Sequence, residues 1–217
     1  MPLKLHYFAG AGRAEVPRLL FNIGGVPFED VTYTYASLAE FKPKAPFGQV
    51  PVLELEDGRM LAQSGAIDRY VAKLTGLYPE DPLQAAFADM VAFHVTDFME
   101  LFVPTWTMPA EEMVKARQGI LAGKGGEKLK QLEKIIEKAE AEGGGWVAGG
   151  KLSFGDLVVY TSLSAITSSV VDGIPKDLLN AYPALKAFRN KVAKLPAIKA
   201  YYDRATEESR ASYKPDP

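Results

Sequence analysis

The stretch KAPFGQVPVLELEDGRMLAQSGAI, Lys44 to Ile67, decides the fold of this chain. It holds two short runs typical of strands, VPVLEL and RMLAQ, which are separated by Asp57-Gly58. This arrangement predicts a β-hairpin with a tight turn. From Ser64 the apolar residues recur at helical spacing, so a helix is expected directly after the second strand.

The residues before the hairpin alternate between strand and helix patterns. LKLHYF (3–8) is expected to be a strand with Leu3, Leu5 and Tyr7 on one face, and a helix follows it that Gly24-Gly25 ends. VTYTY (31–35) is predicted as a second strand and LAEFK (38–42) as a short helix. Residues 1–76 therefore form an α/β domain in the order β-α-β-α-β-β-α.

The residues after this domain predict helices only. A proline-bearing linker, 77–82, leads to a long helix from Leu83 to about Pro104, with Phe87, Met90, Val91 and Phe98 on its apolar side. A second long pattern, 111–142, is expected to break at GKGG. LSFGDL predicts a capping box, in which Ser153 caps a buried helix and Asp156 reaches back. Two more helices, separated by Pro196, complete an all-α domain over 83–217.

The amino-acid composition limits which kinds of functional site this chain can have. The chain has 217 residues, a formal charge of −2, no cysteine and two histidines. No basic surface argues for nucleic acid or a membrane surface, and a thiolate or multi-histidine metal site is not expected. No apolar run reaches the ~20 residues of a membrane span, and no signal peptide is recognised, so the predicted location is the cytoplasm. Catalysis would therefore use Tyr, Ser, Arg, Lys or carboxylates.

Three places carry candidate site residues. Tyr7 ends the first strand, either as a half-buried aromatic residue or as a phenol aimed at a ligand beyond the strand end. Pro51 predicts either a plain edge strand or a cis bond that leaves Val50 free to pair with an extended peptide. Ser64 is expected to cap its helix, and the positive end of that helix, with the Gln63 amide, suits a carboxylate.

Taken together, Tyr7 before GAGRAE, PFGQVPVLE, AQSGAI and SFGDL resemble a cytosolic glutathione transferase, most similar to the sigma class. That class also includes glutathione-dependent prostaglandin D synthases and cephalopod lens crystallins. The resemblance covers nearly the whole chain. It implies a thioredoxin-like N-terminal domain, a helical C-terminal domain, a homodimer, and glutathione as a substrate without a metal.

The resemblance also implies roles for single residues. Tyr7 would hydrogen-bond the glutathione sulfur with support from Arg13, and Asp97 of one subunit would reach the glutathione of the other. The peptide would be held by Lys42, Gln49, Val50, Pro51, Gln63 and Ser64. Phe8 would line the hydrophobic-substrate site, together with Met99, Trp106 and Tyr160. Two departures, Leu38 where a Trp is usual and Gln49 where a Lys is common, weaken the glycine end of the site.

The expected function is therefore conjugation of the glutathione thiolate to small hydrophobic electrophiles. Two alternatives stay open at this point: a glutathione-dependent isomerase of the prostaglandin D synthase type, and a non-catalytic, crystallin-like binding protein. Retention of Tyr7, Arg13 and Gln63-Ser64 argues against the non-catalytic protein. The apolar residues expected around the electrophile do not separate the other two.

Overall fold

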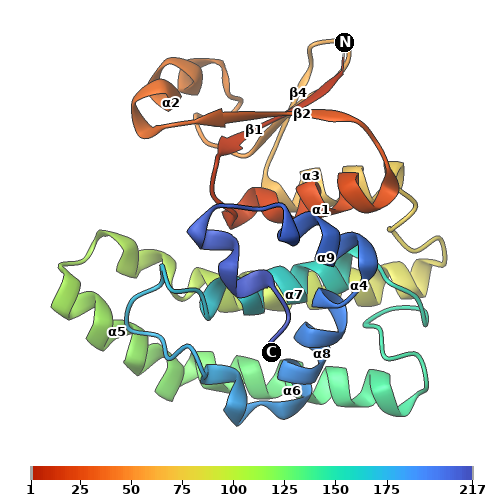
Figure 1. Cartoon of the computed structure of the whole chain (residues 1–217), viewed down its shortest axis with the longest axis vertical. Helices are drawn as coiled ribbons and strands as arrows, with labels where there is room; N and C mark the ends of the chain where they lie inside the picture. The colour runs from red at the N-terminus through yellow and green to blue at the C-terminus, as the bar shows by residue number, and fades with distance from the viewer. Residues whose placement is uncertain (1, 217) are drawn as a thin grey trace.

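The computed structural model describes residues 2–216, which fold into a sheet-containing part and an all-helical part (Figure 1). The sheet has the strand order β2-β1-β3-β4, in which β1 is parallel to β2 and β3 is antiparallel to both of its neighbours. The strands are β1 (Leu3–Phe8), β2 (Phe28–Tyr33), β3 (Val52–Glu54) and β4 (Met60–Ala62). The predicted order of elements and the hairpin around Asp57-Gly58 are confirmed.

The second strand begins and ends earlier along the chain than the sequence predicts. β2 covers 28–33 rather than 31–35, because Thr34 caps the next helix and Tyr35 is that helix's first residue. The Thr34 hydroxyl accepts a hydrogen bond from the Ser37 N–H, which satisfies one of the free donors at a helix start. The local capping chemistry therefore overrides the strand preference of the VTYTY run.

Helices cover both faces of the sheet (Figure 1). The helices of this part are α1 (Glu15–Gly24), α2 (Tyr35–Phe41) and α3 (Ser64–Leu74). α1 and α3 lie between the sheet and the helical part, where Leu5 and Leu53 are buried in the main core. α2 lies on the other face, where His6 stacks on Phe41 with ring centroids 4.5 Å apart.

The all-helical part is built around α7, in which nearly every residue is buried, as its apolar sequence predicts. Its helices are α4 (Pro82–Glu100), α5 (Ala110–Ala122), α6 (Lys124–Ala141), α7 (Phe154–Ile166), α8 (Pro183–Ala193) and α9 (Pro196–Asp203). Short 3₁₀ turns include Val103–Thr107 and the C-terminal segment, Glu208–Tyr213. No helix in residues 2–216 has both the length and the apolar character needed to cross a membrane.

α4 departs from the prediction in two ways. It ends at Glu100 rather than near Pro104, because the chain tightens into a 3₁₀ turn over Val103–Thr107 that holds this proline. Its apolar residues also do not share one face: Val91 and Phe98 are buried, whereas Phe87 and Met90 are exposed. Leu83 and Phe93 are exposed as well, so α4 carries apolar side chains on its surface that this chain leaves uncovered.

The predicted capping box at the start of α7 is present. The buried Asp156 carboxylate accepts hydrogen bonds from the Ser153 N–H, the Ser153 hydroxyl and the Val147 N–H, each at 2.8 Å. Burial raises the pKa of Asp156 to about 6, and these donated hydrogen bonds oppose that shift. Asp156 therefore fixes the loop before α7 as well as the helix itself.

We expect Ser153→Ala to lower the free energy of unfolding by roughly 1 kcal/mol, the usual cost of losing a cap. Urea unfolding followed by circular dichroism measures this change. Because Ser153 lies outside the cavity described below, ligands of that cavity should bind with their wild-type affinity. A large change in that affinity with unaltered unfolding would contradict the structural role of Ser153.

Candidate active site

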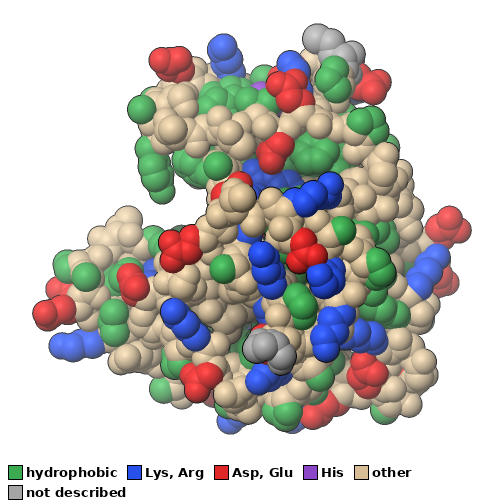
Figure 2. All heavy atoms as spheres, viewed as in Figure 1, with side chains coloured by type: hydrophobic (Ala, Val, Ile, Leu, Met, Phe, Trp, Pro, Cys, Tyr) green, Lys and Arg blue, Asp and Glu red, His purple; other side chains and the backbone are tan. Residues whose placement is uncertain are grey.

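A cavity of about 430 Å³ lies between the two parts of the chain. Figure 2 shows the surface hollowed on the side where α2 and α5 face each other. The lining includes Tyr7, Gly12, Arg13, Ser64, Asp68, Val95, Met99, Trp106, Arg117, Val158, Ser209 and Tyr213. Residues from the sheet end, α3, α4, α5, α7 and the C-terminal segment therefore converge on one space.

Tyr7 lies at the end of β1, where the following turn fixes its hydroxyl. The Tyr7 Oη accepts a hydrogen bond from the Arg13 backbone N–H at 3.1 Å. Gly12 has φ +60°, and a Cβ there would stand 2.6 Å from the Tyr7 Oη. Only glycine fits so close to the phenol. The accepted bond leaves the hydroxyl proton of Tyr7 available to donate into the cavity.

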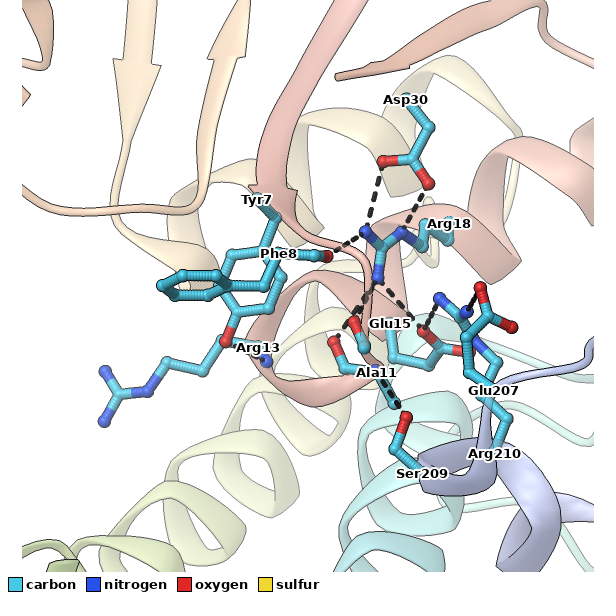
Figure 3. A network of polar contacts seen from close by, with 11 residues as sticks. Tyr7, Phe8, Ala11, Arg13, Glu15, Arg18, Asp30, Glu207, Ser209 and Arg210 are labelled. Atoms are coloured by element: carbon cyan, nitrogen blue, oxygen red, sulfur yellow. Dashed lines mark hydrogen bonds and ion pairs between the residues drawn. The ribbon is translucent and has the colours of Figure 1, made fainter. Parts of the chain in front are cut away.

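Arg13 reaches the cavity, but its guanidinium does not reach the Tyr7 hydroxyl. Its Nη2 donates to Glu100 Oε1 at 2.8 Å, and both side chains are about half exposed. Figure 3 shows the Arg13 side chain directed away from Tyr7. In this structure the backbone N–H of Arg13 donates to the Tyr7 phenol, and the Arg13 guanidinium forms an ion pair with Glu100 of α4.

A buried network of charges holds the turn between β1 and α1 (Figure 3). The Arg18 guanidinium donates to both Asp30 carboxylate oxygens and to the carbonyls of Phe8 and Gly10, at 2.8–3.1 Å. Glu15 accepts from Arg18 and, at 2.9 and 3.1 Å, from Arg210 of the C-terminal segment. The turn that positions Tyr7 is thus fixed from both ends of the chain.

This network was not predicted from the sequence. Glu15 and Arg18 lie three residues apart in a helix, a spacing that signals a surface pair as readily as a buried one. Arg210 is 195 residues away from Glu15 along the chain, so no local pattern links the two.

Gln63 and Ser64 begin α3 in a different way from that predicted. Gln63 has φ +71°, the one positive value among the described non-glycine residues, and its carbonyl accepts the N–H groups of Ala66 and Ile67. Gln63 is therefore the N-cap residue of α3, and Ser64 is the first helical residue rather than the cap. The prediction of a Ser64 cap is wrong, because the strained Gln63 backbone already starts the helix. Ser64 lines the cavity instead.

The residues expected along the peptide lie in the segment between α2 and β3 and at the junction of β4 and α3. The Val50–Pro51 bond is cis, as one sequence interpretation predicted, and β3 starts only at Val52. Lys42 and Gln49 are exposed, and Phe8 is partly buried. Leu38 is only 5 % exposed and packs in a small core with Phe41, Ala45 and Val52, so its side chain is buried rather than open to a peptide.

Among the residues assigned from the helical part, Met99 and Trp106 line the cavity as predicted. Tyr160 does not, because it is fully buried and its hydroxyl donates to the backbone carbonyl of Tyr213. Asp97 is exposed on α4 and forms an ion pair with Lys128 of the same chain at 3.2 Å.

Asp68 is a cavity residue that the sequence interpretation missed. It is 7 % exposed, and its Oδ1 has no hydrogen-bond partner within residues 2–216. Burial raises the pKa of this carboxyl well above its ordinary value, which favours the neutral form. The available signal was its position four residues after Ser64, on the same face of α3. Nowhere in the described chain do three or more His, Cys, Asp or Glu side chains form a possible metal site.

Comparison with known proteins agrees with this architecture. Residues 3–73 match the family "Glutathione S-transferase, N-terminal domain", and residues 96–205 match "Glutathione S-transferase, C-terminal domain". Hematopoietic prostaglandin D synthase of Gallus gallus is 36 % identical over 93 % of this chain and 95 % of its own length. Glutathione S-transferase 3 of Caenorhabditis elegans is 32 % identical over 94 % and 97 %. The sigma class structure from Fasciola hepatica superposes with a TM-score of 0.81 at 28 % identity, covering 95 % of this chain and 98 % of that one.

Proposed function

The chain belongs to the glutathione S-transferase family and is a glutathione transferase, and we propose that Tyr7 is the residue that activates glutathione in it. The single observation that carries this proposal is the Tyr7 hydroxyl in the cavity, where it accepts a hydrogen bond from the Arg13 N–H and keeps its own proton to donate. Tyr7 acts as a donor because its oxygen already accepts the Arg13 N–H, which leaves its O–H to point at the thiolate.

The energy required of Tyr7 is modest. A free thiol has a pKa of ~8.5, so only a few per cent is thiolate at pH 7. Lowering that pKa by ~2 units requires about 2.7 kcal/mol of preferential stabilisation of the thiolate. A hydrogen bond from the phenol to the anion contributes roughly 1.5–3 kcal/mol. The positive end of the helix that follows Arg13 adds to it. The thiolate then attacks an electrophile held beside the apolar side chains of the cavity.

We assign the peptide of glutathione to the edge formed by Lys42, Gln49, Val50-Pro51 and Gln63-Ser64. The exposure of Lys42 and Gln49 and the position of Ser64 in the cavity lining support this assignment. Because Gln49 is neutral and Leu38 is buried, Lys42 is the cation that we assign to the glycine end of this site.

The activity is tested with glutathione and a panel of acceptors: an aryl halide, an isothiocyanate, a lipid hydroperoxide and a prostaglandin endoperoxide. Conjugation of the first two supports the proposed function. Turnover of the endoperoxide alone, with glutathione recovered unchanged, would favour the isomerase alternative. The endoperoxide is included because the chain is similar to a prostaglandin D synthase. We place this activity in the cytoplasm.

A homodimer with shared sites is part of the proposal. The exposed apolar residues of α4, Leu83, Phe87, Met90 and Phe93, support a subunit contact on this helix. Asp97 lies on the same helix and is 67 % exposed. We assign it to the ammonium of glutathione bound in the partner subunit, because an ammonium that leaves water needs an anionic partner.

We expect Asp97→Asn to leave the dimer intact by light scattering and to weaken glutathione binding by ~1–3 kcal/mol, the scale of a charged hydrogen bond. Isothermal titration calorimetry measures this affinity. Lys128→Met is the matched control, since it removes the ion partner of Asp97 but keeps the carboxylate. If Asp68→Asn weakens binding and Asp97→Asn does not, the anionic partner belongs to the same subunit.

A further inference from the structure

Arg117 of α5 differs from the other buried arginines of the chain. Arg18, Arg189 and Arg210 each form an ion pair with a carboxylate. Arg117 is only 1 % exposed, yet no carboxylate oxygen of residues 2–216 lies within 4 Å of it. Its Nε donates to the Thr105 hydroxyl at 2.9 Å, and its Nη1 to the Asp172 carbonyl at 2.8 Å. Its Nη2 has no acceptor in the described structure.

A buried guanidinium without an anionic partner lowers the stability of the folded chain. A guanidinium stays charged in proteins, and a buried charge is costly unless a counter-charge and hydrogen bonds compensate for the lost water. Two neutral oxygens satisfy part of its hydrogen-bonding capacity and none of its charge. Burial lowers the pKa of Arg117, and the charge of Asp172, which forms no ion pair with it, opposes this shift.

Arg117 lines the same cavity as Tyr7. In Figure 1, α5 and the sheet lie on opposite sides of the region that is hollowed in Figure 2, so a ligand that reaches both residues spans the cavity. The rest of the lining is mixed. Its apolar residues include Val95, Met99, Phe102, Val158, Ile166 and Val171, and its charged residues Arg13 and Glu100 pair with each other. The Trp106 ring lies 4.6 Å from the guanidinium carbon and is 58 % exposed. Nη2 is shielded from solvent, so contact with a ligand requires a neighbouring side chain, such as the exposed Trp106 ring over the guanidinium, to move aside.

We propose that Arg117 is a specificity-determining residue that binds the carboxylate of an elongated, otherwise apolar electrophile. This inference rests on the proposed function, because it names the substrate class of that same cavity. A monoanion suits the site, since one unpaired guanidinium balances one negative charge, and the apolar lining matches a hydrocarbon body. A doubly charged phosphate would leave one charge uncompensated.

The first test measures binding without any reaction. Decanoate and decanol are titrated calorimetrically into the dimeric protein in the presence of glutathione. We expect decanoate to bind wild type about 10- to 100-fold more tightly than decanol, and Arg117→Met to abolish most of this preference. Arg117→Lys should keep part of it, because it retains the charge but loses the planar fork. Arg204→Met, at an exposed arginine outside the cavity, is the matched control with the wild-type preference.

A folded Arg117→Met variant with the wild-type preference overturns the proposal. Should that variant fail to fold, the proposal is tested by comparing the binding of decanoate and decanol to the wild-type protein. A protein whose only tryptophan is Trp106, prepared as Trp146→Phe, should change its fluorescence when decanoate binds. Equal binding of decanoate and decanol to wild type would overturn the proposal without any Arg117 variant.

The second test uses conjugation kinetics and separates this inference from the proposed function. The electrophiles are long-chain α,β-unsaturated ketones that end in a carboxylate, each paired with its methyl ester. We expect the acid-to-ester ratio of kcat/KM to fall about 10- to 100-fold in Arg117→Met. Conjugation of both members with an unchanged ratio refutes the carboxylate site and leaves the transferase function standing. Decanoate binding that depends on Arg117, without conjugation of any electrophile, refutes the function and leaves the site standing.

Discussion

Replacing Tyr7 with Phe should lower the kcat/KM of conjugation by about 10- to 100-fold, because it removes the hydrogen bond, worth roughly 1.5–3 kcal/mol, that stabilises the thiolate. The ring of Tyr7 packs edge-on against Phe8 and is partly buried against the main core, and Phe keeps these contacts. The loss should therefore be confined to the hydroxyl. Glutathione affinity, measured by calorimetry, should change little, since we assign the binding of the peptide to residues other than Tyr7.

The neighbouring turn provides the control for this variant. The hydrogen bond that the Tyr7 hydroxyl accepts comes from the backbone of Arg13, so Tyr7→Phe also leaves this N–H without its acceptor. Arg13→Met keeps that N–H and removes only the guanidinium paired with Glu100. We expect a smaller loss from Arg13→Met than from Tyr7→Phe. The reverse order would mean that the cation, and not the phenol, stabilises the thiolate.

Glu15→Gln should be the most destabilising single change at the site, at about 3–5 kcal/mol, the usual cost of removing one partner of a buried ion pair. Glu15 is fully buried and accepts hydrogen bonds from both Arg18 and Arg210. The variant leaves two buried guanidinium groups short of negative charge. Chemical unfolding measures the loss, and the C-terminal segment should become more susceptible to proteolysis.

Glu207→Gln is the matched control for this change. Glu207 also pairs with Arg210, at 2.8 Å, but its side chain is 39 % exposed. A partly exposed pair of this kind contributes at most about 1 kcal/mol. If both variants lose the same small amount of stability, the buried network does not hold the C-terminal segment on the turn.

The parts of the fold that the sequence predicted correctly are those with local causes. The Asp57-Gly58 turn fixes the hairpin, and the Ser153 and Asp156 pair fixes the start of α7, both through contacts among near neighbours. The run of apolar residues in α7 needed no partner to be interpreted as buried. Tyr7 and Ser64 reached the cavity as expected, because strand ends and helix starts meet at one edge of the sheet.

The parts that were missed depend on distant residues. The exposed face of α4 also carries large apolar side chains, so spacing alone could not tell which residues, Phe87 or Val91, enter the core. Leu38 is buried by α2 packing on the sheet, which a family comparison at one position does not report. Arg117 has an ordinary place in a helix pattern, and only the surrounding elements reveal that its charge is unpaired.

The most direct test of the account is the ultraviolet titration of glutathione bound to wild type and to Tyr7→Phe, in which the thiolate absorbance is followed against pH. The account predicts a bound thiol pKa about 2 units below the free value of ~8.5 in wild type, and a value close to the free one in Tyr7→Phe. An equally lowered thiol pKa in both proteins would contradict the assignment of thiolate stabilisation to the Tyr7 hydroxyl.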